Sequence, residues 1–264
     1  MKNTLFILCC LMSALSLNAQ FLPGEMGYTP TQQQPFAEMH VKTMLSTMID
    51  ADGWTVPYAM HFYNTNGWLE ETRYLQDSTL AEEERSPDMI DYYTYYPDGR
   101  IHFIEMEGYD ALPIKYGFEY DKKNRLTALI IASAEAREFT YTYDKNNLPV
   151  RRNGKMARWV YKDENDTEGK LEMVSVEQTD YNWDDNGRLV GQTLWYMNEW
   201  TNRTAYQYND KGQLTSSAVY YDNSDVAIPA FITTYFYYEN GLPEKIKILE
   251  DGFEVTYMYT YTYY

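Results

Sequence analysis

Aromatic side chains are the residues of this sequence best suited to chemistry, and that chemistry is ligand binding. Trp195, Tyr196 and Trp200 bracket a short turn, and Trp68 follows the glycine of an earlier turn. Such rings beside Asn, Asp and Glu side chains suit sugars, because ligand sites combine apolar or aromatic walls with a few placed polar groups. The alternative is that these rings belong to the packing layer of a repeat sheet. We take the four residues as candidate ligand contacts.

Other residue types give no indication of catalysis. His40, His61 and His102 lie in three different parts of the chain, and no nucleophile motif such as Gly-x-Ser-x-Gly occurs. Asp and Glu number 39, so any two could be drawn as a glycosidase pair and the pairing carries no information. We expect a protein that is not an enzyme and has no cofactor. A hydrolase with a carboxylate site is the least favoured alternative.

One acidic segment has a superficial likeness to a calcium loop. In residues 163–169 the sixth position, where such a loop needs glycine, is Glu168, and no flanking helices are expected. Cys9 and Cys10 both lie in the first 19 residues, so cleavage after Ala19 would leave no disulfide and no thiolate ligand. We expect no metal site.

Residues 1–19 have the form of a secretory signal peptide, with Lys2 before an apolar run and Ala19 at the cut. A lipoprotein is the alternative, but it would need a small residue where Leu8 stands. No later stretch approaches the ~20 apolar residues of a membrane span. We expect an exported protein without a transmembrane segment, in the periplasm or at the cell surface.

Charge and composition narrow the partners and the fold class. The formal net charge is −17, and loss of Lys2 with the signal makes it −18, so we expect no binding to nucleic acid. The chain has 28 Tyr and 6 Trp. Tyrosine favours strands, because its ring packs while its hydroxyl finds a partner at a half-wet surface. The composition predicts extensive β-sheet.

Three segments are expected. Residues 1–19 form the signal, residues 20–45 a spacer rich in Pro and Gln, and residues 46–264 a repeat domain. Residues 41–49 are rich in β-branched side chains and favour a first strand over a helix.

A seven-residue pattern recurs along the repeat domain and predicts its turns. An aromatic residue comes first, Asn or Asp is usual second, Gly or Asn stands fifth, and Leu, Ile or Pro stands last. The second residue can cap a type I turn, and the fifth must enter the left-handed region to rejoin the partner strand. The seven turn residues are Gly67, Gly99, Asn124, Asn147, Gly187, Gly212 and Gly241. A degenerate eighth copy, residues 161–171, carries Gly169.

The spacing of the copies fits one β-hairpin per repeat. Residues 139–143 and 257–263 alternate aromatic with other residues, often Thr, as half-buried strands do. We expect an all-β array of consecutive antiparallel hairpins in one curved, twisted sheet, open or partly rolled, with no large helical domain. Irregular connections at 108–113, 197–202 and 222–229 share the opposite rim, where we expect binding loops.

These repeats resemble the YD repeat of the RHS and teneurin families, whose core reads Tyr-x-Tyr-Asp-x-x-Gly-Arg-Leu. Residues 184–189 and 120–126 match it best, and the resemblance covers about residues 60–243. The chain also resembles small exported YD-like proteins of Bacteroidetes. The resemblance implies a spiral of hairpins. In RHS proteins the spiral closes around a cargo, but this chain has too few copies for such a shell.

Together these features predict an exported, non-enzymatic binding or surface-interaction module whose ligand is a carbohydrate or another protein. The alternative is a structural or assembly protein that associates through a sheet edge. The C-terminal strand, residues 257–264, would supply that edge.

Overall fold

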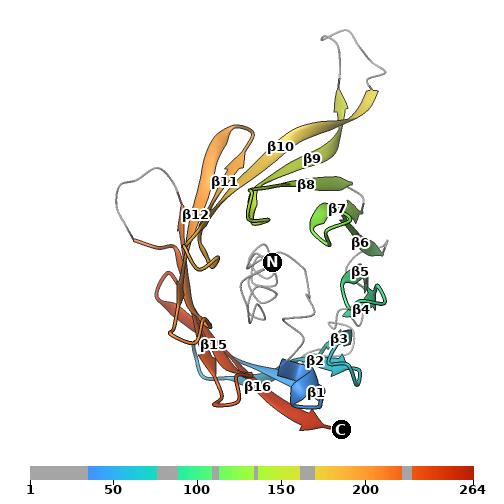
Figure 1. The fold of residues 1–264 in the computed structure, drawn as a ribbon. Helices are drawn as coiled ribbons and strands as arrows, with labels where there is room; N and C mark the ends of the chain where they lie inside the picture. The colour runs from blue at the N-terminus through green and yellow to red at the C-terminus, as the bar shows by residue number, and fades with distance from the viewer. Residues whose placement is uncertain (1–34, 76–88, 109–112, 134–135, 161–169, 222–227) are drawn as a thin grey trace, which may run out of the picture.

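The computed structural model describes residues 35–75, 89–108, 113–133, 136–160, 170–221 and 228–264, except for the side chain of Trp200. In these residues sixteen antiparallel strands follow one another around a closed barrel, each paired with its neighbours in sequence (Figure 1). The strands are β1 (Val41–Ile49), β2 (Thr55–Tyr63), β3 (Leu69–Tyr74), β4 (Met89–Tyr95), β5 (Ile101–Glu107), β6 (Ile114–Tyr120), β7 (Leu126–Ala132), β8 (Arg137–Tyr143), β9 (Pro149–Val160), β10 (Lys170–Trp183), β11 (Leu189–Tyr196), β12 (Glu199–Tyr208), β13 (Leu214–Tyr221), β14 (Phe231–Tyr237), β15 (Pro243–Glu250) and β16 (Phe253–Tyr263).

The sheet is closed, so the prediction of an open or partly rolled sheet was wrong. β16 pairs with β1 along its length, from Val41 opposite Tyr263 to Ile49 opposite Thr256. The C-terminal strand is therefore not a free edge. Twist accumulates from strand to strand, and closure pairs the backbone groups that an open sheet would leave exposed.

The predicted strand character and the absence of a helical domain are confirmed for the described residues. The one helical element there is a single turn at residues 35–38. The described residues contain no helix with the length and apolarity that a membrane span requires.

The motif turns share one backbone geometry. All seven residues at the fifth position have positive φ, between 62° at Asn124 and 88° at Gly241. In the turn at Asp184, its amide donates to the Arg188 carbonyl at 2.9 Å. The Asp184 carboxylate accepts from the amides of Asn186 and Arg188 at 2.9 and 2.8 Å. The side chain thus caps the turn while Gly187 supplies the left-handed residue.

Strand order places all seven turns at one end of the barrel, here called the motif rim. They join β2 to β3, β4 to β5 and so on to β14 and β15. The other connections form the opposite end, here called the irregular rim. The degenerate copy around Gly169 lies outside the described residues, between the end of β9 at Val160 and the start of β10 at Lys170.

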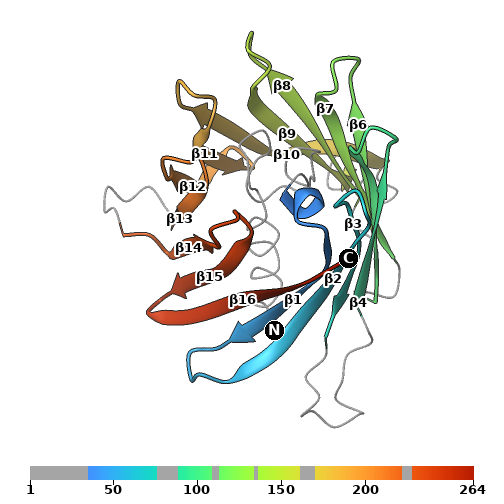
Figure 2. The same ribbon diagram turned by 60° about the horizontal axis from the view of Figure 1, so that its bottom comes forward.

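The inner face of the barrel is apolar. The helical turn at 35–38 lies within the ring (Figure 2), and its Phe36 ring stacks on Tyr63 with centroids 4.7 Å apart. The same face buries the first residue of several strands that follow a motif turn. These residues are Leu69, Ile101, Leu126, Leu189 and Leu214. The opposite face carries ion pairs such as Lys115–Glu105 and Lys247–Glu254. The inner face is therefore mainly apolar, although it also buries Asp91 and the Arg152–Glu177 ion pair, and the outer face carries exposed charged pairs.

Polar groups of aromatic side chains tie most of the hairpins to the one before them. Tyr208 donates to the Leu189 carbonyl at 2.8 Å, and Tyr237 donates to the Leu214 carbonyl at 2.9 Å. Burial raises the pKa of Tyr208 to about 12, so its hydroxyl keeps its proton in neutral solution. Hydroxyl contacts of the same type join Tyr95 to Leu69, Tyr143 to Leu126 and Tyr261 to Pro243. The indole N–H of Trp183 donates to the Pro149 carbonyl in the same way. The repeated aromatic residue thus links neighbouring repeats.

Candidate ligand-binding site

Trp195 lies at the end of β11, beside the irregular rim. Its cross-strand neighbours are Gln178 on β10 and Trp200 on β12. Gln178 lies opposite Asn153 of β9, and its amide donates to Asp180 at 3.0 Å. Asp180 forms an ion pair with an arginine of β9 on the charged face, which places Trp195, Gln178 and Asn153 on the outside of the wall.

The turn next to Trp195 is tighter than the sequence suggested. Met197 and Asn198 have φ of 53° and 67°, which indicates a two-residue turn of the type that suits the right-handed twist of a hairpin. β12 already begins at Glu199, so most of the predicted irregular connection 197–202 is strand. This short turn holds Asn198 beside the middle of β10, near Val176.

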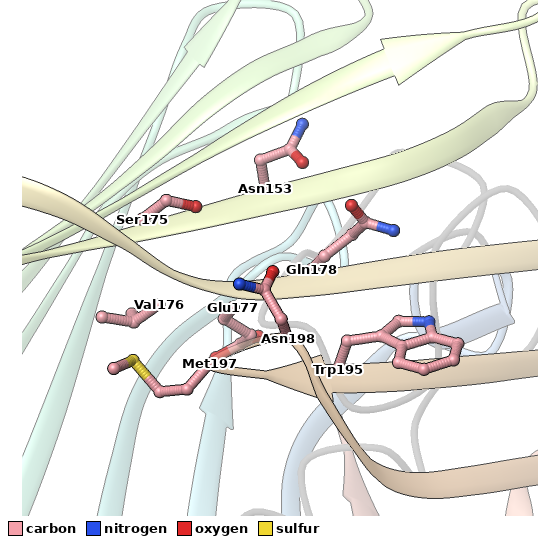
Figure 3. Close-up of a pocket in the computed structure, with 8 residues that line it drawn as sticks. All are labelled: Asn153, Ser175, Val176, Glu177, Gln178, Trp195, Met197 and Asn198. Atoms are coloured by element: carbon pink, nitrogen blue, oxygen red, sulfur yellow. The ribbon is translucent and has the colours of Figure 1, made fainter.

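A pocket of about 230 Å³ opens beside Trp195 (Figure 3). It is lined by Asn153, Ser175, Val176, Glu177, Gln178, Trp195, Met197 and Asn198. Figure 3 shows the amide groups of Asn153, Gln178 and Asn198 among the lining residues, with the Trp195 ring extending to one side of them. These groups offer hydrogen-bond donors and acceptors without net charge.

The Trp195 indole nitrogen is buried and has no hydrogen-bond partner among the described residues. A buried N–H without a partner costs about 1–3 kcal/mol, so it favours any ligand that brings an acceptor to it.

A backbone irregularity in β10 shapes the pocket. The register with β9 shifts between Ser175 and Glu177, so that Val176 bulges out of the ladder. The Val176 carbonyl instead accepts from the Met197 amide at 2.8 Å, which draws the β11–β12 turn toward the bulge. On the partner strand, a Cβ added at Gly154 would lie 3.0 Å from that of Glu177. Glycine therefore lets the two strands approach here.

The carboxylate in the pocket is already engaged. Glu177 forms an ion pair with Arg152, and both side chains are largely buried. Arg152 also donates to Thr179 at 3.1 Å and lies over the Phe139 ring at 4.7 Å. This pairing engages the Glu177 carboxylate with Arg152 rather than leaving it free for a ligand.

The structure separates the four predicted site residues. Trp195 lines the pocket. Tyr196 points to the opposite face, where its hydroxyl accepts from Arg158 at 3.0 Å. The side chain of Trp200 lies outside the described residues, although its backbone pairs with Trp195.

Trp68 is at the motif rim, at the other end of the barrel from the pocket. A Cβ at Gly99 would lie 2.9 Å from its ring, and its centroid is 5.3 Å from that of Tyr95. It packs one motif turn against the next and takes no part in this site.

The histidines remain apart in the structure. His61 lies on the inner wall, where its Nδ1 is 2.9 Å from the Thr72 hydroxyl. Burial lowers its pKa to about 4, so the ring is neutral at pH 7. His102 packs between Tyr96 and Phe103. In the described ranges no three His, Cys, Asp or Glu side chains lie close enough together to bind a metal ion. Residues 163–169, where we predicted no calcium site, lie outside these ranges.

No protein-family model and no curated protein matches the chain. Solved structures do. The fold is similar to that of a porin-like protein. A porin-like protein from Bacteroides uniformis has a TM-score of 0.52 and 12% identity, over 84% of this chain and 98% of that one.

A second porin-like protein, from Bacteroides vulgatus, has a TM-score of 0.39 and 11% identity, over 83% of this chain and 98% of that one. A chain of the TcdB2-TccC3-Cdc42 complex has a TM-score of 0.25 and 12% identity, over 73% of this chain and 14% of that one. At these identities the likeness to porin-like proteins is one of fold, and the site must be judged on its own residues.

Proposed function

We propose that this protein is an exported, non-enzymatic binding module that lies in an aqueous compartment rather than in a lipid bilayer and binds a carbohydrate in the Trp195 pocket. The observation that carries the proposal is a pocket lined by Trp195 and by the amides of Asn153, Gln178 and Asn198, in which the buried indole N–H of Trp195 has no hydrogen-bond partner among the described residues.

The chemistry of the pocket favours a neutral, hydroxyl-rich ring. An indole and three amides can donate to and accept from hydroxyl groups, and they carry no charge to attract an ion. The volume of about 230 Å³ is below the 300–1,000 Å³ typical of sites for drug-sized ligands, so it suits a single small ring. The ion pair of Glu177 with Arg152 supports binding rather than acid–base catalysis.

The outer face of the wall supports a location in water rather than in lipid. Membrane barrels turn an apolar band outward, and an outward Arg or Lys at mid-depth costs about 2–4 kcal/mol. Here the outward face carries Arg151 paired with Asp180 at 2.6 Å and Lys247 paired with Glu254 at 2.7 Å. In this proposal the chain shares a barrel fold with porin-like proteins but has the opposite distribution of polarity.

We also propose that the chain is a YD-type repeat protein. The seven turns with one backbone geometry and the aromatic hydroxyl contacts between hairpins support this assignment. The alternative of assembly through the C-terminal strand loses its basis, because β16 is paired with β1.

Glycan-array screening of the purified mature protein, followed by calorimetry on the best ligand, tests the function. We expect binding that weakens at least tenfold, about 1.4 kcal/mol, in Trp195→Ala. Trp54→Ala is the matched control, because Trp54 is a tryptophan of the same rim that is 72% exposed and outside the pocket.

Equal loss in both variants, or a folded wild type that binds no glycan, would overturn the proposal. In the second case a protein ligand becomes the better hypothesis.

A further inference from the structure

The β9–β10 hairpin extends beyond the barrel wall and forms an arm (Figure 1). These strands have 12 and 14 residues, whereas the other strands have 6 to 11. The strand ladder between β8 and β9 ends at Met156, and that between β11 and β10 ends at Glu177. Among the described residues, residues 158–160 therefore pair only with residues 170–172, and residues 173 and 174 pair only with Ala157 and Met156.

Register sorts the arm into two unlike faces. Trp159 lies opposite Leu171, and Ala157 lies opposite Met173, so these four side chains share one face. The other face carries Arg158 opposite Glu172. The first face is apolar although it is open to solvent, with Trp159 60%, Leu171 56% and Met173 41% exposed.

The apolar face of the arm runs directly into the pocket. Below Ala157 and Met173 on the same face come Lys155 opposite Ser175 and then Asn153 opposite Gln178, which is the cross-strand neighbour of Trp195. From Asn153 to Trp159 is six residues along one strand, or about 20 Å at ~3.3 Å per residue. The outer face thus forms one continuous strip with a pocket at its foot and an exposed tryptophan at its tip.

We propose that the ligand is an oligosaccharide that lies along this strip, with one ring in the Trp195 pocket and a distal ring on Trp159. This inference rests on the proposed function. The strip is apolar on the arm, carries the charged Lys155 beside Ser175, and ends in the neutral amides of the pocket. Apolar surface followed by hydrogen-bonding groups matches a chain of sugar rings, which offers both apolar faces and hydroxyls. A contiguous exposed apolar surface of this kind marks a binding surface in soluble proteins.

The strip favours a glycan over a peptide. An extended peptide would add to a free strand edge through its backbone. The free edge of β10 carries Lys170 and Glu172, and a bulge at Val176 interrupts it, features that protect an edge from such pairing. The free edge of β9 is short, residues 158–160, and carries Arg158. The exposed surface that remains is the face of the arm, which offers side chains rather than backbone groups.

Calorimetry with cellulose, starch, mannan and chitin fragments of one, two or four rings tests the inference. For the series that binds, we expect affinity to rise with length in the wild type. Trp159→Ala should bind the four-ring fragment about tenfold more weakly and the single ring unchanged. Trp195→Ala should weaken both, and Trp54→Ala neither.

The outcomes separate the two proposals. Two outcomes contradict the oligosaccharide proposal but not the proposal of a single ring in the Trp195 pocket. One is binding of a single ring with no gain in affinity for longer fragments. The other is equal affinity of the wild type and Trp159→Ala for the four-ring fragment. A folded wild type that binds no member of the panel overturns both. Pairing of an extended peptide with the arm, detected as new amide protection on residues 170–175, would replace the oligosaccharide with a peptide ligand.

Discussion

The two rims of the barrel differ in what their residues do. At the motif rim, polar side chains cap seven turns of one geometry, and packing reaches across from turn to turn, as Trp68 does at Gly99. The irregular rim carries the pocket and the arm. It also carries apolar side chains that are largely exposed to solvent, such as Trp54 and Phe253, which are 72% and 68% exposed.

This difference separates stability from binding within one molecule. Turn geometry, buried Leu residues and tyrosine hydroxyl contacts are concentrated toward the motif rim, where they hold neighbouring hairpins together. The irregular rim is then free to vary in length and composition, because little of the packing between hairpins depends on it. Substitutions at the two rims should therefore have unlike consequences.

The largest effect is expected for Gly67→Ala. Gly67 has φ of +73°, and an added Cβ would lie 2.3 Å from the backbone nitrogen of Ala37 in the helical turn inside the ring. We expect a loss of about 3–5 kcal/mol in the free energy of unfolding, from left-handed strain plus overpacking. Urea denaturation measures it.

Gly252→Ala at the irregular rim is the control for this prediction. Its φ is +86°, but nothing lies within 4 Å of its added Cβ, so only the strain of about 1–2 kcal/mol remains. Equal losses at the two glycines would contradict the difference between the rims.

An acid-dependent effect should trace to His61 on the inner wall. Its pKa falls from 6.5 to about 4 on folding, so the unfolded chain binds the proton more tightly than the folded one. The contribution to stability is complete above pH 6.5 and is lost as the pH falls toward 4, by up to about 3 kcal/mol. Urea midpoints of the wild type and of His61→Gln, measured between pH 7 and 4, should converge toward the acid end; parallel curves would exclude His61 as the source.

A smaller effect is expected for Tyr208→Phe, which removes the 2.8 Å hydrogen bond to the Leu189 carbonyl between two hairpins. Loss of one such partner costs about 1 kcal/mol. Tyr196→Phe is the matched control near the irregular rim, where the hydroxyl contact with Arg158 is exposed, and it should cost less than about 0.5 kcal/mol. The reverse order, read from thermal or urea unfolding, would argue against the hydroxyl contacts as links between repeats.

The smallest effect is expected at the exposed apolar tips. Trp54→Ser and Phe253→Ser should change the free energy of unfolding by no more than about 0.5 kcal/mol, because these side chains bury little surface. Static light scattering of concentrated samples should show equal or weaker self-association than in the wild type. A loss above ~1 kcal/mol for either variant would mean that the irregular rim contributes to the barrel's packing.

Local steric rules made much of the barrel predictable from its sequence. The positions of Gly67, Asn124 and Gly187 follow from the need for a left-handed residue in a short turn, and the flanking alternation follows from the two faces of a strand. Closure did not follow from such rules. It depends on the accumulated twist of all sixteen strands, which no single repeat records.

The pocket was predictable only in part, for a similar reason. Trp195 was recognisable by type, but Asn153 and Gln178 meet it through strand register set by the bulge at Val176. Register of this kind is a long-range property, since the three residues come from three strands. Gly154, a glycine inside a strand, was the one local sign that two backbones approach closely there.

Because the first strand pairs with the last, the chain could be opened at another turn without loss of the barrel. The Tyr264 amide donates a hydrogen bond to the His40 carbonyl at 2.9 Å, and the Tyr264 hydroxyl donates to the Tyr63 carbonyl. In both contacts the two residues are more than 200 positions apart in sequence. The ring therefore has no structural beginning. A circularly permuted gene that joins residue 264 to residue 35 through a short linker, and opens at Asp251-Gly252, should encode the same barrel with its seam moved by one strand.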